Sequence, residues 1–241
     1  MVGIRRAIAL LFLGFYVTQF TMTAFLGPDE LFACYLGLAL CYLAAFFGLA
    51  AEWFWARWFA MGVGNFGSLL LLVLFKVGME PIIAFVGGTH LLITLCLMGE
   101  GMAAKYEHSE RTAERWGFQE ESMALMRRAI KSAGSTLPFL ILYGLAPREE
   151  MMGINYLAFG LGALGVFAIV RQRTWGLFAL GGAGAIALAD GLGFFGERTL
   201  GYLALQPDMT PTLYGPFGIA AGALMIIPLL FWKPLARWMR A

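Results

Sequence analysis

Charged residues are scarce in this sequence. Only 13% of its 241 residues are charged, and it has two histidines and three cysteines. Soluble domains carry about 25% charged and about 45–50% apolar residues, whereas 60% of this chain is hydrophobic and its mean hydropathy is +0.75. These values exclude a soluble globular domain, a disordered segment and a coiled coil. They predict an all-α protein, a polytopic bundle of membrane-spanning helices.

The signatures of most membrane enzymes are also missing. The sequence has no Walker A loop, no H-E-x-x-H and no G-x-S-x-G. A bis-histidine haem needs two histidines in the membrane, but only His90 lies in an apolar run, since His108 lies in a charged segment. The three cysteines form no C-x-x-C pair, which argues against a zinc site or a disulfide framework. We therefore expect no cofactor, no metal and no nucleic-acid partner, and an enzyme is the least supported class.

What the sequence does contain is a series of long apolar runs. A helix needs about 20 apolar residues to cross the hydrocarbon core, and seven runs meet this length. An eighth run, 132–147, is shorter and contains Pro138. The first run follows Arg5 and Arg6 without a small-residue cleavage site, so we expect a retained span. The predicted spans are 7–26, 31–51, 56–77, 81–99, 132–147, 153–170, 174–195 and 212–232.

The positions of the basic residues decide between seven and eight spans. With eight, 14 basic residues fall on one side and 3 on the other; without 132–147 the division is 11 to 6. Because Lys and Arg concentrate in cytoplasmic loops, we predict eight spans with both termini in the cytoplasm. Trp53, Trp55 and Trp58 then lie at an inner span end and are interpreted as headgroup-level anchors. The 14 inner residues are Arg5, Arg6, Arg57, Lys105, Arg111, Arg115, Arg127, Arg128, Lys131, Arg171, Arg173, Lys233, Arg237 and Arg240, and the three outer ones are Lys76, Arg148 and Arg198.

The segment 101–131 is the only sizeable polar element between the apolar runs. Its apolar residues recur at helical spacing beside a charged face, which predicts an amphipathic helix on the inner membrane surface. An alternative is that this face docks a cytoplasmic partner. The chain thus divides into spans one to four (1–100), the linker helix (101–131) and spans five to eight (132–241). The residues of the membrane-surface or partner-docking face are Trp116, Met123, Met126 and Ile130.

Four polar residues lie well inside the spans, where such residues are costly and often functional. They are the candidates for binding substrate or for proton coupling: His90, Asp190, Gln19 and Asn65. At about 1.5 Å per residue, the first three lie in one slab, about 7–13 Å from the outer ends of their spans, and Asn65 lies about 18 Å deep. They would meet if spans one, four and seven were neighbours. Structural hydrogen bonds between helices are the alternative.

Three functions follow from these observations. A small-solute or ion-coupled transporter is favoured by the polar group and by a weak similarity between the two halves, since parallel repeats occur in transporters. A non-catalytic accessory or assembly subunit of a larger membrane complex is favoured by the few intramembrane charges and the linker helix. A membrane enzyme acting on a lipid or quinone would need His90 and Asp190 to act together. Membrane lipids, and a homo-oligomer or larger complex, are the expected partners. The charge pattern fits a bacterial inner membrane and would also fit a eukaryotic one.

Overall fold

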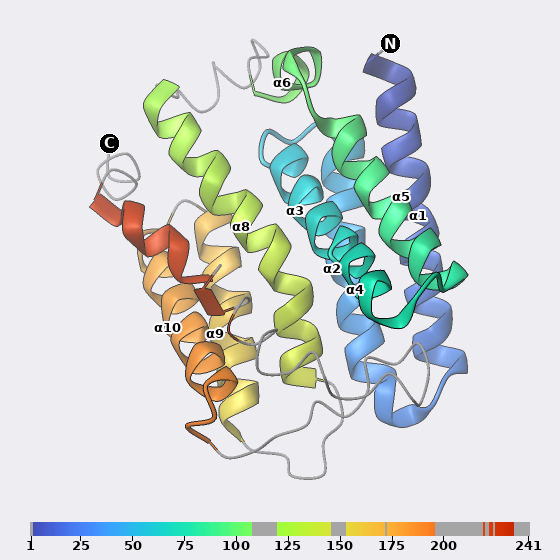
Figure 1. Ribbon diagram of the computed structural model, residues 1–241. Coiled ribbons are helices and arrows are strands. Elements are labelled where there is room, and N and C mark those ends of the chain that lie inside the picture. The colour runs from blue at the N-terminus through green and yellow to red at the C-terminus, as the bar shows by residue number, and fades with distance from the viewer. Residues whose placement is uncertain are drawn as a thin grey trace. The chain divides into compact units, whose positions relative to one another are not determined.

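The computed structural model describes residues 2–107, 120–145, 153–171, 173–195, 219, 222–223 and 225–233 (Figure 1). Within these residues the chain forms helices and no strands. The all-α class predicted from composition is therefore confirmed for the described part of the chain.

The described helices cover the first seven predicted apolar runs, and local sequence explains several of their ends. Part of the eighth run, 212–232, lies outside the described residues. Pro81 opens α5, where a missing N–H costs nothing, and the Glu80 carboxylate accepts a 2.9 Å hydrogen bond from the Ile83 N–H. Gly78 ends α4 with φ +83° and Gly99 follows α5 with φ +94°, a conformation that favours glycine. The bounds are α1 Val2–Leu26, η1 Asp29–Leu31, α2 Phe32–Ala50, α3 Ala56–Ser68, α4 Leu70–Val77, α5 Pro81–Leu97, α6 Glu100–Tyr106, α8 Glu120–Leu145, α9 Gly153–Val170, α10 Trp175–Gly191 and η2 Ile227–Phe231.

Two of these helices, α1 and α2, are long and apolar enough to cross a membrane. Helices α5 and α6 would together make a third candidate, although the chain bends by 73° between them. Helices α9 and α10 are apolar but shorter. The described helices thus support a membrane protein with two or three candidate spans, and the predicted total of eight stays a prediction.

The predicted surface helix over 101–131 is wrong in its extent. Helix α6 ends at Tyr106, and α8 runs without interruption from Glu120 to Leu145, with Pro138 inside it. The second half of the linker is therefore the beginning of a longer helix. Close packing explains the difference, because a Cβ at Gly134 of α8 would lie 2.5 Å from the backbone oxygen of Phe59 in α3. Within the described residues, Met123, Met126 and Ile130 of the apolar stripe are covered by protein.

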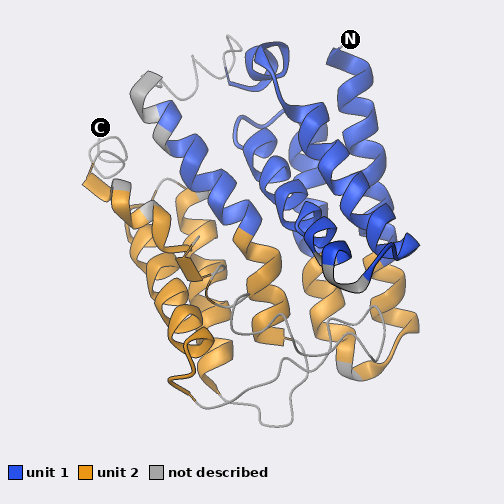
Figure 2. Ribbon diagram, in the orientation of Figure 1, with its two compact units in different colours: residues 1–19, 39–135 blue, residues 20–38, 136–241 orange. Residues whose placement is uncertain are grey.

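Packing divides the chain into two compact units (Figure 2). Unit 1 contains residues 1–19 and 39–135, and unit 2 contains residues 20–38 and 136–241. The sequence-based blocks 1–100, 101–131 and 132–241 follow chain order, whereas the boundaries of the units fall inside α1, α2 and α8. Long helices take part in more than one local cluster of contacts, so the units do not coincide with the predicted blocks.

Unit 1 is a bundle whose helices alternate in direction. Arg5 at the start of α1 and Arg57 at the start of α3 both donate to backbone oxygens at the end of α5. Arg6 donates to backbone oxygens at the end of α2, 2.8 Å to that of Ala50. The starts of α1 and α3 therefore lie at the same end of unit 1 as the ends of α2 and α5. This alternation is what successive membrane spans require.

Unit 2 is held together by glycines at helix contacts. A Cβ at Gly165 of α9 would lie 2.8 Å from the backbone nitrogen of Leu180 in α10, and one at Gly184 of α10 would lie 2.8 Å from the Gly222 oxygen. Such close approach is typical of membrane helices that pack through small residues. The Gly- and Ala-rich sequence of α10 thus serves helix packing.

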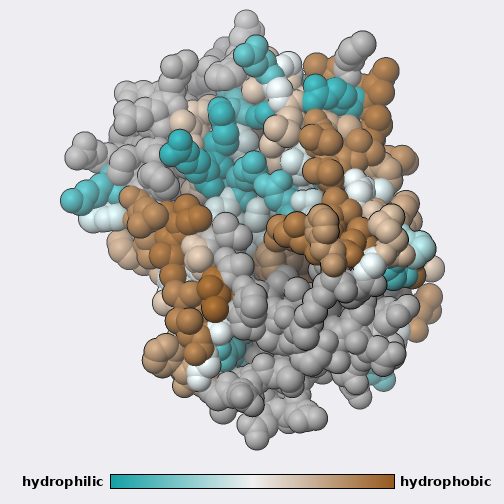
Figure 3. Space-filling view, in the orientation of Figure 1, coloured by the Kyte–Doolittle hydropathy of each residue, from teal (hydrophilic) through white to brown (hydrophobic). Residues whose placement is uncertain are grey.

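The exposed surface of unit 1 is largely hydrophobic along its apolar helices. Leu11 and Phe15 of α1, Phe75 of α4 and Phe85 of α5 are all exposed. Figure 3 shows hydrophobic side chains over the surface that α1 and α5 form. Large exposed apolar surfaces mark contact with a membrane or a partner, and here they lie on helices with the length or composition of spans.

Candidate functional site

His90 lies at the centre of a buried polar cluster in unit 1. Its Nε2 is 2.6 Å from the Tyr42 hydroxyl and its Nδ1 is 2.7 Å from the Val86 backbone oxygen. A carbonyl oxygen can only accept, so Nδ1 carries a proton, and in the neutral imidazole Nε2 accepts from the Tyr42 hydroxyl. His90 and Tyr42 are each 1% exposed. Both imidazole nitrogens are therefore hydrogen-bonded, and the ring is shielded from solvent.

Tyr16 of α1 also packs against the imidazole and against the ring of Tyr42. Its ring centroid lies 4.2 Å from that of His90, at an interplanar angle of 41°. The Tyr16 hydroxyl is 2.5 Å from Thr89 Oγ1, which also donates to the Phe85 backbone oxygen at 2.7 Å. Helices α1, α2 and α5 thus meet through two tyrosines, a threonine and one histidine.

The helix facing His90 is interrupted at this level. The predicted third span consists of α3 and α4, which are separated at Leu69. Ser68 Oγ donates to the Asn65 backbone oxygen at 2.8 Å, and the Leu69 N–H bonds back three residues to Phe66. Hydroxyl bonds of this kind compete with the helical ladder and bend helices. Gly67 lies directly against the His90 ring, which a Cβ there would overlap.

Asn65 lies on the same helix contact. Thr94, one turn after His90 on α5, is 3.3 Å from Asn65 Oδ1 through its Oγ1. A Cβ at Gly64 would lie 3.0 Å from the His90 backbone oxygen. Two of the four predicted polar residues, His90 and Asn65, therefore belong to one contact between α3 and α5.

The other two predicted polar residues lie elsewhere. Gln19 is exposed on α1, and the residue of α1 that reaches His90 is Tyr16, one turn earlier. Asp190 belongs to unit 2, where its Oδ2 accepts a hydrogen bond from the Tyr143 hydroxyl. The hydrogen bonds described for His90 and for Asp190 are made within their own units.

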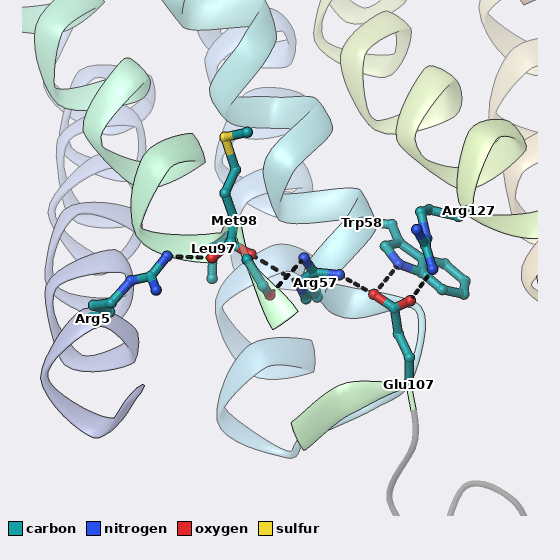
Figure 4. A network of polar contacts seen from close by, with 8 residues as sticks. Arg5, Arg57, Trp58, Leu97, Met98, Glu107 and Arg127 are labelled. Atoms are coloured by element: carbon teal, nitrogen blue, oxygen red, sulfur yellow. Dashed lines mark hydrogen bonds and ion pairs between the residues drawn. The ribbon is translucent and has the colours of Figure 1, made fainter. Parts of the chain in front are cut away.

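A second polar cluster in unit 1 surrounds the carboxylate of Glu107 (Figure 4). Its Oε1 accepts hydrogen bonds from Arg57 Nη1 and, at 2.8 Å, from Trp58 Nε1, and its Oε2 accepts from Arg127 Nη2 at 2.5 Å. The Glu107 side chain is 0% exposed and that of Arg57 is 7% exposed. This ion pair joins the end of α6 to α3 and α8.

The same end of unit 1 uses arginines to cap helices. Arg57 Nε donates to the Leu97 oxygen at 2.8 Å, and Arg5 Nη2 donates to the oxygens of Leu95, at 2.9 Å, and of Met98. The last carbonyls of a helix lack intrahelical partners and carry partial negative charge. The arginines therefore satisfy the end of α5 (Figure 4).

Glu52 forms a more exposed ion-pair group beside these caps. Its Oε1 lies 2.8 Å from Lys105 Nζ and 2.5 Å from Arg6 Nη1. The hydrogen bond from Lys105, together with the charges of Lys105 and Arg6, lowers the pKa of the Glu52 carboxyl. The carboxylate is therefore ionised in the folded protein around neutral pH.

The predicted docking face of the linker is buried in unit 1. Met123, Met126 and Ile130 have 6% or less of their surface exposed, so they do not form a surface for a membrane or a partner. Trp116, the fourth residue of that face, lies outside the described residues. The Trp58 ring, interpreted as a headgroup anchor, is also fully buried, and its indole N–H donates to Glu107 instead of lying at the headgroup level.

Sequence reasoning missed Tyr16, Tyr42 and Glu107. The two tyrosines lie within apolar runs and were read as part of the hydrophobic spans, although a buried tyrosine hydroxyl usually needs a partner. Glu107 lies in a charged segment, which suggests a solvated position. No sequence signal indicates that its carboxylate is buried against α3 and α8, where it accepts hydrogen bonds from Arg57, Trp58 and Arg127.

Comparisons of the chain with family models, with curated proteins and with solved structures find no match.

Proposed function

We propose that the chain is an integral protein of a bacterial inner membrane, with eight spans and cytoplasmic termini, and that it transports a small solute coupled to proton movement. The orientation is supported by the gathering of Arg5, Arg6 and Arg57 at one end of unit 1. Basic residues favour the cytoplasmic side of a membrane. The starts of α1 and α3 then face the cytoplasm.

The observation that supports transport is the His90–Tyr42 pair beside the interruption between α3 and α4. Ionisable residues within a span are costly and mark ion or proton pathways. Transporters place their sites at discontinuous helices near the middle of the membrane. Unit 1 combines both features, since Gly67 touches the imidazole one residue before α3 ends.

The geometry gives protonation a mechanical consequence. A neutral His90 accepts from the Tyr42 hydroxyl through Nε2. A protonated imidazole donates from both nitrogens, so the Tyr42 hydroxyl must turn its proton away and accept instead. The hydrogen bond between α2 and α5 is thereby remade each time His90 gains or loses a proton. This is a local change that could be linked to movement of the interrupted helix.

The test is proton movement in proteoliposomes, reported by an enclosed pH-sensitive dye, with a panel of amino acids, sugars and organic acids. We expect one solute class to drive proton movement with the unmodified protein and none with His90→Asn. The matched control is His108→Asn, which removes the only other histidine. Equal movement with His90→Asn, or no movement with any solute, would contradict the proposal.

The other two functions considered from the sequence have less support. The accessory-subunit hypothesis depended on an apolar face of the linker that would dock a partner. Three residues of that face, Met123, Met126 and Ile130, are buried. The lipid or quinone enzyme depended on contact between His90 and Asp190, whereas both nitrogens of His90 are engaged by Tyr42 and Val86. Transport is therefore the function that the described contacts favour.

A further inference from the structure

Tyr143 of α8 and Asp190 of α10 meet at one end of unit 2, where α9 begins. Tyr143, near the end of α8, donates a hydrogen bond to Oδ2 of Asp190 in the last turn of α10. The next residue, Gly144, packs against α9, because a Cβ there would lie 3.3 Å from the backbone oxygen of Asn155 and 2.6 Å from Cβ of Phe159. Tyr143 therefore lies next to both Asp190 and the first turn of α9.

The register of α9 and α10 brings Asn155 to the level of Asp190. Gly165 lies opposite Leu180, and a Cβ at Gly182 would lie 3.7 Å from the Leu161 side chain. Continuing this antiparallel register places Asn155 within about 3 Å, along the helix axes, of Asp190. Asp190 also falls on the helical stripe of α10 that faces α9, since it lies 14 residues, about four turns, after Gly176, where a Cβ would lie 2.7 Å from the Gly165 oxygen of α9.

Asn155 carries an unsatisfied oxygen toward the interior of unit 2. It is 4% exposed, and its Oδ1 has no hydrogen-bond partner in the described part of the chain. It lies on the buried stripe of α9 that includes Ala158 and Gly162, the latter against Leu140 of α8. A buried acceptor without a partner destabilises the folded protein, so a ligand that uses this oxygen would remove that cost.

The chemistry of the three groups fits a small cation. A carboxylate, an amide carbonyl and a phenol are hard oxygen ligands, which suit alkali and alkaline-earth ions. Helices α8 and α10 both end at this level, and the negative end of a helix dipole favours cations. One carboxylate balances one positive charge.

We propose that Tyr143, Asn155 and Asp190 form a binding site for a single Na⁺ ion. In the proposed transport cycle, Na⁺ would be a second coupling ion beside the proton. The role of the bound Na⁺ in transport rests on the proposed function, whereas the binding of Na⁺ does not. Transport would then depend on Na⁺. Binding itself can be measured on the purified protein without any solute flux.

The direct test is equilibrium binding of ²²Na⁺ to the full-length protein in detergent, with choline as the replacement cation. We expect saturable binding of one Na⁺ per chain. Asn155→Leu and Asp190→Asn should each weaken it tenfold or more, because each removes an oxygen ligand or the balancing charge. Tyr143→Phe should weaken it as well. Tyr156→Phe is the matched control: it removes the same hydroxyl from an exposed position beside Asn155 and should bind like the unmodified protein.

A second measurement covers variants that fail to fold. Na⁺ should raise the thermal stability of the unmodified protein above that in choline at equal ionic strength, since a ligand stabilises the state that binds it. No saturable Na⁺ binding, or unchanged binding in folded Asn155→Leu or Asp190→Asn, would overturn the site. Na⁺ binding without solute flux would contradict transport alone. Flux that needs His90 in a protein that binds no Na⁺ would contradict the Na⁺ site alone.

Discussion

The hydroxyl of Tyr42 donates a 2.6 Å hydrogen bond to Nε2 of His90, inside the part of unit 1 from which solvent is excluded. The Val86 oxygen fixes the proton on Nδ1 and so leaves Nε2 as the acceptor. The pair links α2 to α5 through one bond that is sensitive to protonation. Both residues can be altered without removing an aromatic ring.

Tyr42→Phe removes this bond and leaves a buried imidazole nitrogen unsatisfied. We expect the free energy of unfolding in detergent to fall by about 1–3 kcal/mol. Chemical unfolding followed by tryptophan fluorescence provides the measurement. In a His90→Phe background the same change should cost much less, because the partner is gone. An equal cost in both backgrounds would show that the bond does not stabilise the protein.

Gly67→Ala places a methyl group where the His90 ring lies. We expect destabilisation of about 1–3 kcal/mol, the usual cost of overpacking, together with loss of proton movement. Gly88→Ala on α5 is the matched control, because a Cβ there meets nothing within 4 Å. That control should leave stability unchanged or raise it by up to about 1 kcal/mol, since alanine favours a helix over glycine. If both variants behave alike, the Gly67–His90 contact is not tight.

Glu107→Gln removes the negative charge that faces the buried guanidinium of Arg57. Breaking a buried ion pair by removing one partner costs about 3–5 kcal/mol. Arg127→Gln should cost far less, because the Arg127 side chain is 46% exposed and water replaces its interaction. Thermal unfolding of the two variants in the same detergent gives the comparison. Similar losses would mean that Arg57 is solvated in the folded protein.

The stability contribution of Glu52 should vary with pH. Its pKa is lowered by Lys105 and Arg6, so the contribution is complete above the unfolded value of 4.5 and is lost as pH falls through the folded pKa. The effect should stay below about 1 kcal/mol, because the side chain is 42% exposed. We expect Glu52→Gln to melt below the unmodified protein at neutral pH and to match it in acid. A gap in melting temperature that persists in acid would contradict this origin.

The helical fold and the polar face of α5 were accessible from the sequence. Gly87, His90 and Thr94 share one face by helical period, and in the structure this face packs on α3 and α4. Helical geometry depends on neighbours three and four residues away, which sequence displays directly. The location of the linker was predicted wrongly because a helix with an apolar stripe beside a charged face has the same sequence pattern on a membrane surface and against other helices of the protein.

The sequence by itself determined the helical class, and its low charge and long apolar runs indicate a membrane protein. It also placed His90 and Asn65 among the polar residues of the spans. Only the tertiary structure decided that His90 pairs with Tyr42, that Glu107 is buried beneath two arginines, and that Asp190 pairs with Tyr143. These contacts join residues 20–50 positions apart, and their formation depends on which helices become neighbours. Which helices become neighbours is decided by how whole helix faces pack against each other. A local sequence pattern carries no information on this packing.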